Sequence, residues 1–515
     1  MKAMNRSLVC GLAVVLLLWA HDASADQEWT NLSLSGEPIK HSEKAYGDLE
    51  AEFEFSRIAG HSFVGLVVRA QDARRYYVVE FPFCGQQIRE GHFWAAITRM
   101  DETGYAKVLM LERVPGVPGE AGLWHQARVV VKGDEIRLWV NGRPLPPVRD
   151  AAYPAVGRVG MVQWNDCGFR NLRIRGTETL APAWDEAAKP VQNWFRPTPS
   201  LDGCPYPKRA PNGDLLMSIN KSVMRSTDQG RTWKEVWRTE TDRPSGVGAL
   251  AKTADGRMIL VRQSSVANPC LIEVADSTDN GQSWSPFVNA GELKFAEAVN
   301  YVSTYGQVLE LRDGALAWFG FATVESPTFV EGGHRYRPAQ IPGRMCFCIR
   351  SEDGGRTWSA PVNIDGPNPR PDQWMSFKDQ VSEVTAMETL EGEIVVFNRP
   401  GTAWAMWETR SKDGGKTWTP MSTGPFLSYA SAAVPRATAS GALVVGGRFP
   451  ALAIYVSRDN GMTWETYQAD TETWAMGNMY EVAPDVVLYL YGSQGGGALR
   501  AQLIQITPDG IKPIR

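Results

Sequence analysis

The sequence predicts an all-β protein made of two folded units. Two patterns carry this prediction: the stretch from Leu32 to Gly176 alternates apolar and polar residues with the period of a strand, and the later chain repeats one turn motif five times. Length is a third observation, because 515 residues exceed the roughly 250 to 300 residues at which one hydrophobic core stops growing. The 49 glycines and 19 tryptophans suit short strands joined by tight turns.

The N-terminus has the features of an export signal. Lys2 and Arg6 supply positive charge, residues 8–20 are almost wholly apolar, and Ala23-Ser24-Ala25 is a small-residue cleavage site. We therefore expect residues 1–25 to be removed and the mature protein to be secreted or periplasmic. The apolar run is too short to span a bilayer comfortably, and no other run is longer, so no transmembrane segment is predicted.

The composition limits the kinds of partner and cofactor that are expected. Lys and Arg number 53 against 57 Asp and Glu, so the net charge of -4 offers no long-range attraction to nucleic acid. Histidines number only six, and Cys346 and Cys348 have no second pair at zinc-ligand spacing, so no metal and no cofactor are expected. An exported chain can oxidise its cysteines, and Cys84 with Cys167 is the favoured pair in the first unit.

The first unit, residues 26–180, shows strand alternation and no helical periodicity. Six strands are predicted, at 50–56, 63–70, 76–83, 127–132, 136–140 and 171–175. The text from Trp124 to the Asn141-Gly142 turn, with the strands at 156–161 and 169–174, resembles the last strands of concanavalin-like jelly rolls of the laminin-G and carbohydrate-binding kind. The resemblance implies a β-sandwich that serves as a spacer or a dimer contact.

A linker rich in Ala, Pro and polar residues follows, from Thr177 to Pro199, so the boundary is expected near Leu180. The second unit, residues 181–515, contains the pattern S-x-D-x-G-x-x-W at 226–233, 277–284, 351–358, 411–418 and 457–464. In this pattern Ser and Asp hydrogen-bond the backbone of a turn, Gly supplies a positive φ, and Trp fills the gap between sheets. The motif therefore predicts sheets, and its Asp residues are expected to be structural.

Five such boxes, followed by the final strands from Tyr480 to Ile506, predict a six-bladed β-propeller whose last blade lacks the box. Residues 195–515 resemble the sialidase (neuraminidase) family, six-bladed propellers that carry these Asp boxes. The resemblance implies a cleft on the propeller axis, where the innermost strands of all blades converge.

Counting from the turn glycines locates candidate site residues. Positions nine before and seven after such a Gly should be neighbours at one end of a blade, which selects Glu383 and Arg399 around Gly392 and Arg448 after Gly441. Tyr480 is expected near the start of the last inner strand, on the same face. The sialidase resemblance matches these four residues, in order, to a Glu and an Arg of one blade, an Arg of the next and a nucleophilic Tyr.

Together these residues suit hydrolysis of a ketosidic acid by a Tyr nucleophile. A neutral phenol avoids the repulsion that a carboxylate would meet at an anionic substrate, but it needs a base, for which Glu383 is the candidate. Arg399 and Arg448 would grip the substrate carboxylate. The alternative is structural, since a Tyr in a strand is usually packing and an Arg after a strand is usually a surface group.

The chain departs from the family at the first blade. Gly203 stands where the family has an Arg, and Arg209 could replace it only if the strand were shifted. The loop that carries the family's acid Asp has no counterpart, which leaves Asp202 as a candidate acid or a turn residue. Further cleft material could come from the insertion at 323–344, with His334, Arg335, Arg337 and Arg344, and from Trp374, Trp404, Trp407 and Trp474.

Three functions follow from these observations. The first is an exported retaining exo-glycosidase of sialidase type, which releases a terminal acidic sugar from a glycan. The second is a non-catalytic glycan-binding propeller, and the third is a surface protein in which both units serve adhesion.

Overall fold

The computed structural model describes residues 28–515 apart from a set of shorter stretches. Those stretches are 33, 35–38, 59–61, 84–92, 115–119, 165–166, 182, 186–190, 202–204, 241–245, 267–268, 296–298, 305–306, 325–328, 332–333, 337–343, 365–380, 401–405, 427–429, 450, 471–475 and 493–497. The predicted export signal, residues 1–25, lies outside the described residues. Within them every regular element is a strand, so the predicted all-β class is confirmed.

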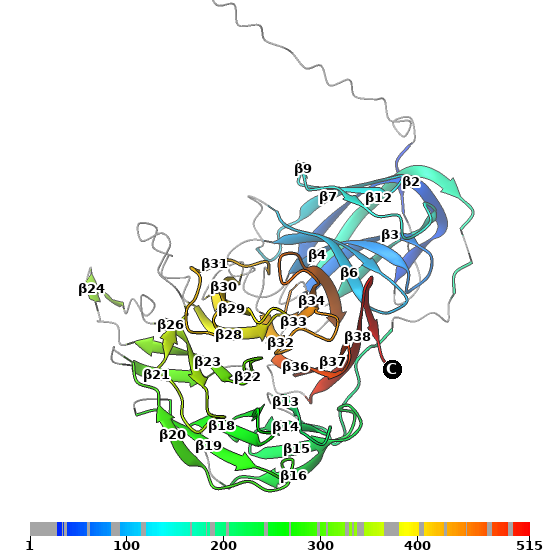
Figure 1. Cartoon of the computed structure of the whole chain (residues 1–515). Coiled ribbons are helices and arrows are strands. Elements are labelled where there is room, and N and C mark those ends of the chain that lie inside the picture. Colours follow the sequence, from blue (N-terminus) through cyan, green and yellow to red (C-terminus); the bar gives the residue numbers. More distant parts are fainter. Residues whose placement is uncertain are drawn as a thin grey trace, which may run out of the picture.

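The described part of the N-terminal unit contains twelve strands and is drawn blue to cyan-green in Figure 1. They are β1 (Thr30–Asn31), β2 (Lys40–Arg57), β3 (Ser62–Ala70), β4 (Tyr76–Phe83), β5 (Trp94–Met100), β6 (Ala106–Arg113), β7 (His125–Lys132), β8 (Glu135–Val140), β9 (Arg143–Pro144), β10 (Val148–Arg149), β11 (Gly157–Trp164) and β12 (Cys167–Thr179). The long strand β2 pairs with β7, β11 and β12, so three other strands of the unit are hydrogen-bonded to it.

Alternation along β2 explains its position. Phe53 and Phe55 enter the core of the unit, whereas Glu52 and Glu54 point outward and pair with arginines of β12. All six predicted strands of this unit lie within observed strands. Strands β5 and β6 were not predicted.

The rest of the chain forms small antiparallel sheets of consecutive strands, a propeller arrangement of which five sheets stand separately. The first is β13 (Tyr206–Arg209), β14 (Leu215–Ile219), β15 (Ser222–Ser226) and β16 (Lys234–Arg238); the second is β17 (Ala249–Lys252), β18 (Met258–Gln263), β19 (Leu271–Ser277) and β20 (Val288–Glu292). The third is β21 (Val299–Thr304), β22 (Leu309–Glu310), β23 (Leu316–Val324), β26 (Arg344–Ser351) and β27 (Val362–Asn363).

The remaining sheets follow the same order. The fourth is β28 (Val381–Glu388), β29 (Ile394–Pro400), β30 (Trp407–Ser411) and β31 (Ser422–Thr423), and the last is β36 (Met476–Ala483), β37 (Val486–Gly492), β38 (Arg500–Thr507) and β39 (Gly510–Pro513). Between them lie β32 (Ala430–Ala433), β33 (Leu443–Gly447), β34 (Leu452–Ser457) and β35 (Glu465–Asp470), which continue into the N-terminal sheet because β35 pairs with β6.

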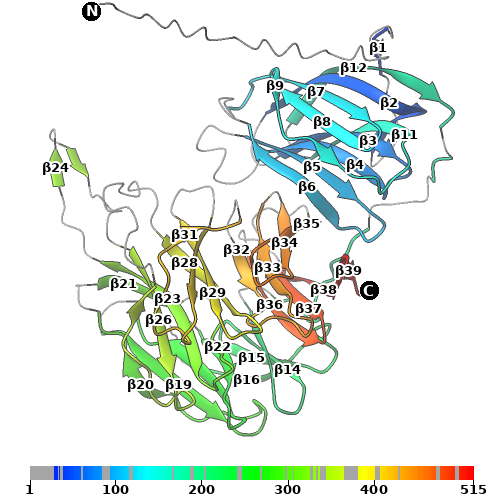
Figure 2. The same ribbon diagram turned by 45° about the horizontal axis from the view of Figure 1, so that its top comes forward.

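The first strands of these sheets contact one another in a closed sequence, β13–β17–β22–β28–β32–β36 and back to β13. The third sheet is represented by β22, which pairs with β23 beside β21 and so continues the first strand. These first strands therefore surround a common axis. A separate hairpin, β24 (Phe329–Glu331) with β25 (His334–Tyr336), projects from the third sheet (Figure 2).

The five Asp boxes are built alike, as turns between the third and fourth strands of their sheets. In the box at 411–418, the Ser411 hydroxyl donates to Asp413 at 2.8 Å and accepts the Gly415 N–H at 2.8 Å, and the Trp418 indole donates to the Gly415 carbonyl at 3.1 Å. Burial works to raise the pKa of Asp413, but hydrogen bonds from Thr417 and Ser411 lower it to about 2. The other four boxes repeat these contacts, so their carboxylates are committed to the turns.

Candidate functional site

The two ends of each propeller sheet are distinguished by strand direction. We call these ends lower and upper. The turn between the first and second strands of a sheet lies at its lower end. The first strand begins, and the second strand finishes, at its upper end. The Asp boxes, which follow the third strands, also lie at the lower end. Glu383, Arg399 and Arg448 belong to the upper end, because Glu383 is near the start of β28, Arg399 is near the end of β29, and Arg448 follows β33 directly.

Glu383 and Arg399 form an ion pair between neighbouring strands. The pairing of Val384 with Asn398 places them side by side, as counting from Gly392 predicted. Their side chains keep 20% and 33% of their surface exposed, respectively. A carboxylate and a guanidinium are thus available to a ligand at the upper end of this sheet.

Arg448 occupies the corresponding place in the next sheet, seven residues after Gly441, but it is buried. The residue that follows, Phe449, is also buried, and its carbonyl accepts a hydrogen bond from the Tyr455 hydroxyl at 2.7 Å. The backbone beside Arg448 is therefore fixed by its own sheet.

The structure corrects the predicted place of Tyr480. Its strand begins at Met476, so Tyr480 is not near the start, and Tyr480 pairs with Leu488 in the lower half of the sheet. Counting from a turn glycine was not possible in this sheet, because it has no Asp box and turns at Asp485, with φ 57°, in place of a glycine.

The surroundings of Tyr480 are those of the lower axis. Burial raises the pKa of the phenol to about 12, with a further contribution from the charge of Glu310, against the opposing influence of Arg209 and Arg436. The Lys208 ammonium lies 5.9 Å from the centre of the ring. Neither Glu383 nor Arg399 is among these neighbours, so the structure brings together two of the four predicted residues and places Tyr480 in another environment.

Lys208 is the centre of this lower cluster. Its side chain is 1% exposed, and its ammonium donates to the Val308 carbonyl at 2.8 Å and lies 3.5 Å from Glu310. Burial lowers the pKa of Lys208, against the pull of Glu310. The ammonium therefore links the first sheet to the third across the axis, a role that the sequence did not indicate.

Backbone amides complete the cross-links. Glu310 accepts the N–H of Lys252 at 2.6 Å, and Glu388 accepts the N–H of Arg312 at 2.9 Å, each from the preceding sheet. Arg209 donates to the carbonyl of Val482 in the last sheet. Arg209 thus serves the lower end, and the structure does not place it where the missing upper arginine would be.

Several predicted candidates lie outside the described residues: Asp202, Gly203, Cys84, Arg337, Trp374, Trp404 and Trp474, and the side chains of His334, Arg335 and Arg344. Trp407 packs partly buried against the core between the third and fourth sheets. Cys167 is buried, and its thiol donates to the Phe63 carbonyl at 3.1 Å. The Cys84–Cys167 pair remains a prediction.

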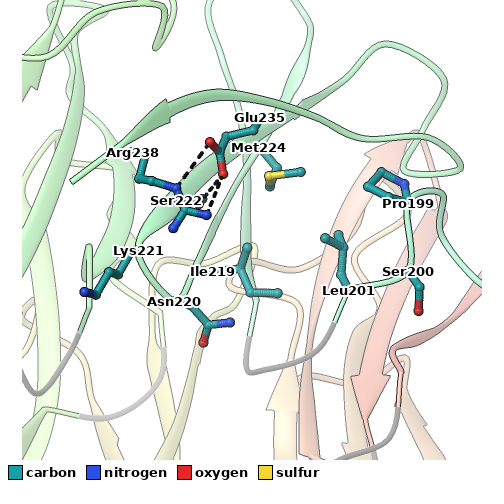
Figure 3. Close-up of a pocket in the computed structure, with 10 residues that line it drawn as sticks. All are labelled: Pro199, Ser200, Leu201, Ile219, Asn220, Lys221, Ser222, Met224, Glu235 and Arg238. Atoms are coloured by element: carbon teal, nitrogen blue, oxygen red, sulfur yellow. Dashed lines mark hydrogen bonds and ion pairs between the residues drawn. The ribbon is translucent and has the colours of Figure 1, made fainter. Parts of the chain in front are cut away.

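A cavity of about 560 Å³ lies at the upper end of the first sheet, around the Asn220-Lys221 turn (Figure 3). Glu235 accepts a hydrogen bond from Ser222 at 2.5 Å and pairs with Arg238 at 3.3 Å on its wall, above apolar side chains that include Leu201. No sequence motif marks these residues. Across the described part of the chain, no group of three or more His, Cys, Asp or Glu is placed to hold a metal ion, and no helix there could cross a membrane.

The fold and the turns define an Asp-box propeller preceded by a β-rich N-terminal unit. Residues 455–466 match the BNR/Asp-box repeat, and residues 26–175 match the family model described as a 3-keto-alpha-glucoside-1,2-lyase-like domain. None of the curated protein sequences matches the chain.

Three solved structures are among those to which the chain is similar. A Dyadobacter fermentans protein of unknown function is 18% identical, covering 62% of this chain and 100% of its own, with a TM-score of 0.45. A Penicillium chrysogenum alpha-L-arabinanase complexed with arabinobiose is 16% identical over 61% of this chain and 97% of its own, TM-score 0.45. A Hadza microbial sialidase is 15% identical over 92% of this chain and 98% of its own, TM-score 0.44.

Proposed function

We propose that the protein recognises an acidic sugar at the upper end of its propeller, with Arg399 and Arg448 as the cations and Glu383 beside them. The observation that carries this proposal is the partly exposed Glu383–Arg399 ion pair. A guanidinium presents two parallel N–H groups to a carboxylate, and a ligand carboxylate or hydroxyl can share this pair without burying a lone charge. The carboxylates of the Asp boxes offer no such site, because they are committed to turns.

Hydrolysis by a sialidase-type mechanism is the second candidate. It is favoured by the pairing of Glu383 with Arg399, the arrangement that the sialidase resemblance implies for one blade. It also requires Tyr480 as the nucleophile with Glu383 as its base, and the lower-axis neighbours of Tyr480 weigh against that step. We therefore place glycan recognition first and turnover second.

Titration calorimetry with sialic acid and with glucuronic acid tests recognition, with galactose as the neutral control. Arg399→Met and Arg448→Met should each weaken binding of the acids at least about tenfold, since truncating a charged hydrogen-bond partner costs about 2 to 5 kcal/mol. Unchanged affinity in both variants, or no binding of either acid by the unsubstituted protein, would overturn the proposal.

Aryl glycosides of the same sugars test turnover, because a good leaving group needs little help from a general acid. Turnover that disappears in Tyr480→Phe while acid binding persists would establish hydrolysis. Binding without turnover on any aryl glycoside would establish a lectin.

Three architectural features belong to the same proposal. Strands β32–β35 act as the sixth blade, supported by the place of β32 between β28 and β36 around the axis. Residues 26–180 form the concanavalin-like sandwich, and residues 1–25 direct export, which places the protein in the periplasm or outside the cell.

A further inference from the structure

The N-terminal unit is joined to one propeller sheet by backbone pairing. Strand β6 pairs with β35, the last strand of the β32–β35 sheet, with Val108 opposite Thr466 and Ala106 opposite Gln468. Figure 1 shows the unit beside β34, and Figure 2 shows it beside β34 and β35. Because β35 would otherwise be an open edge, this pairing fixes the unit to the sheet that precedes β36.

Side chains on both sides of the pairing reinforce it. The buried Tyr105 hydroxyl donates to Gln502 at 3.1 Å, the Gln468 amide donates to Glu80 at 2.6 Å, and Lys107 pairs with Glu465 at 2.5 Å. These side-chain contacts add to the backbone pairing of β6 with β35. The unit is thus held in one orientation against the propeller.

One contact of this interface reaches the proposed site. The rings of Trp94 and Phe449 meet edge to face with centroids 5.5 Å apart, and the two residues are 4% and 1% exposed. Phe449 is bonded directly to Arg448, and the Tyr455 hydroxyl holds its carbonyl. Arg399, in the neighbouring sheet, is held by Glu383 of its own sheet instead.

We propose that Trp94 is a positioning residue for Arg448: the N-terminal unit clamps Phe449 and thereby fixes the chain that presents the second cation. The inference rests on the proposed function for the role of Arg448, whereas the clamp itself stands on the contacts. A guanidinium binds a carboxylate through two parallel hydrogen bonds only when its direction is set, and a supporting shell of packed side chains sets it.

Hydrogen exchange on the full chain tests the clamp without a ligand. In Trp94→Ala, amides at residues 446–449 should exchange at least about tenfold faster, while those of β29, which carries Arg399, should not change. Trp94→Phe should restore slow exchange, because it keeps an aromatic ring against Phe449. The matched control is Trp124→Ala, since Trp124 belongs to the same unit and is 41% exposed. Equal exchange at 446–449 in Trp94→Ala and the unsubstituted protein would overturn the inference.

Binding of the acidic sugars then tests whether the clamp positions Arg448. At a temperature where every variant is folded, Trp94→Ala should raise the Kd for the acidic sugar about tenfold, whereas Trp94→Phe and Trp124→Ala should leave the Kd unchanged. If 446–449 loosens but the Kd stays the same, the positioning role fails. If the unsubstituted protein binds neither sialic acid nor glucuronic acid, the proposed function fails, and the exchange data alone decide whether the clamp exists.

Discussion

The upper and lower ends of the propeller are built in different ways. At the lower end, carboxylates, guanidiniums and backbone amides of different sheets bond to one another around the axis, with Lys208 buried among them. The Asp-box turns lie at this end as well. At the upper end, the candidate residues are a partly exposed ion pair within one sheet and one arginine beside the interface with the N-terminal unit.

This difference separates the residues that close the ring of sheets from the residues proposed to bind a sugar. Cross-links between sheets stabilise the ring only if they are buried and fully bonded, which leaves them no capacity for a ligand. Side chains that keep exposure contribute little to stability and remain available. Substitutions at the lower end should therefore reduce stability and leave ligand binding unchanged, whereas substitutions at the upper end should mainly reduce ligand binding. The four substitutions below are ordered by their expected effect on stability.

Lys208→Met tests the lower end most severely. Removing the ammonium leaves Glu310 without its buried cation, so the free energy of unfolding should fall by about 3 to 5 kcal/mol. Urea unfolding measures this loss. Lys416→Met is the control, because Lys416 is exposed and should cost less than about 1 kcal/mol. Equal losses in both variants would mean that the axial cluster does not hold the sheets together.

Glu80→Gln tests the interface that supports the upper end. Burial raises the pKa of Glu80 from 4.5 to about 7, so the folded protein binds this proton more tightly than the unfolded chain does. Stability should therefore decrease as pH rises from about 4.5 to about 7, by about 3 kcal/mol for this group, and then level off.

In Glu80→Gln this contribution disappears, while the amide oxygen still accepts the hydrogen bond from Gln468. Unfolding curves of both proteins at pH 5 and pH 8 check the sign: the variant should gain on the unsubstituted protein as pH rises. A constant difference across this range would show that Glu80 titrates normally.

Asp413→Ala tests the outer part of the lower end. The substitution removes hydrogen bonds from Ser411 and Thr417, so the free energy of unfolding should fall by about 2 kcal/mol. Asp509→Ala, at an exposed position outside any box, serves as the control. Binding of acidic sugars should be unaffected in both variants. If Asp413→Ala lost binding but kept normal stability, this Asp box would have a functional role.

Glu383→Gln should have the smallest effect on stability, below about 1 kcal/mol, because the pair with Arg399 is partly exposed. Its effect on affinity for acidic sugars should be larger than its effect on unfolding. Calorimetry and urea unfolding of the same preparation compare the two. A loss of more than 2 kcal/mol in stability would place this pair with the structural cross-links and remove the distinction between the two ends.

The sequence by itself determined the all-β class, the Asp boxes and the neighbourhood of Glu383 and Arg399. These features depend on local rules: turn chemistry sets the boxes, and strand pairing across a turn glycine brings residues nine before and seven after it together. Counting could not be applied to Tyr480, because the last sheet turns at Asp485 in place of a glycine and carries no box, and its expected place at the start of the strand was wrong.

Only the tertiary structure decided which side chains meet across sheets. Lys208, Glu310 and Glu388 are unremarkable in the sequence, and their cross-links arise because first strands of different sheets surround one axis. The pairing of β6 with β35 likewise joins residues more than 350 positions apart, such as Lys107 and Glu465. Contacts of this kind depend on how separate sheets are arranged in space, which no local spacing encodes.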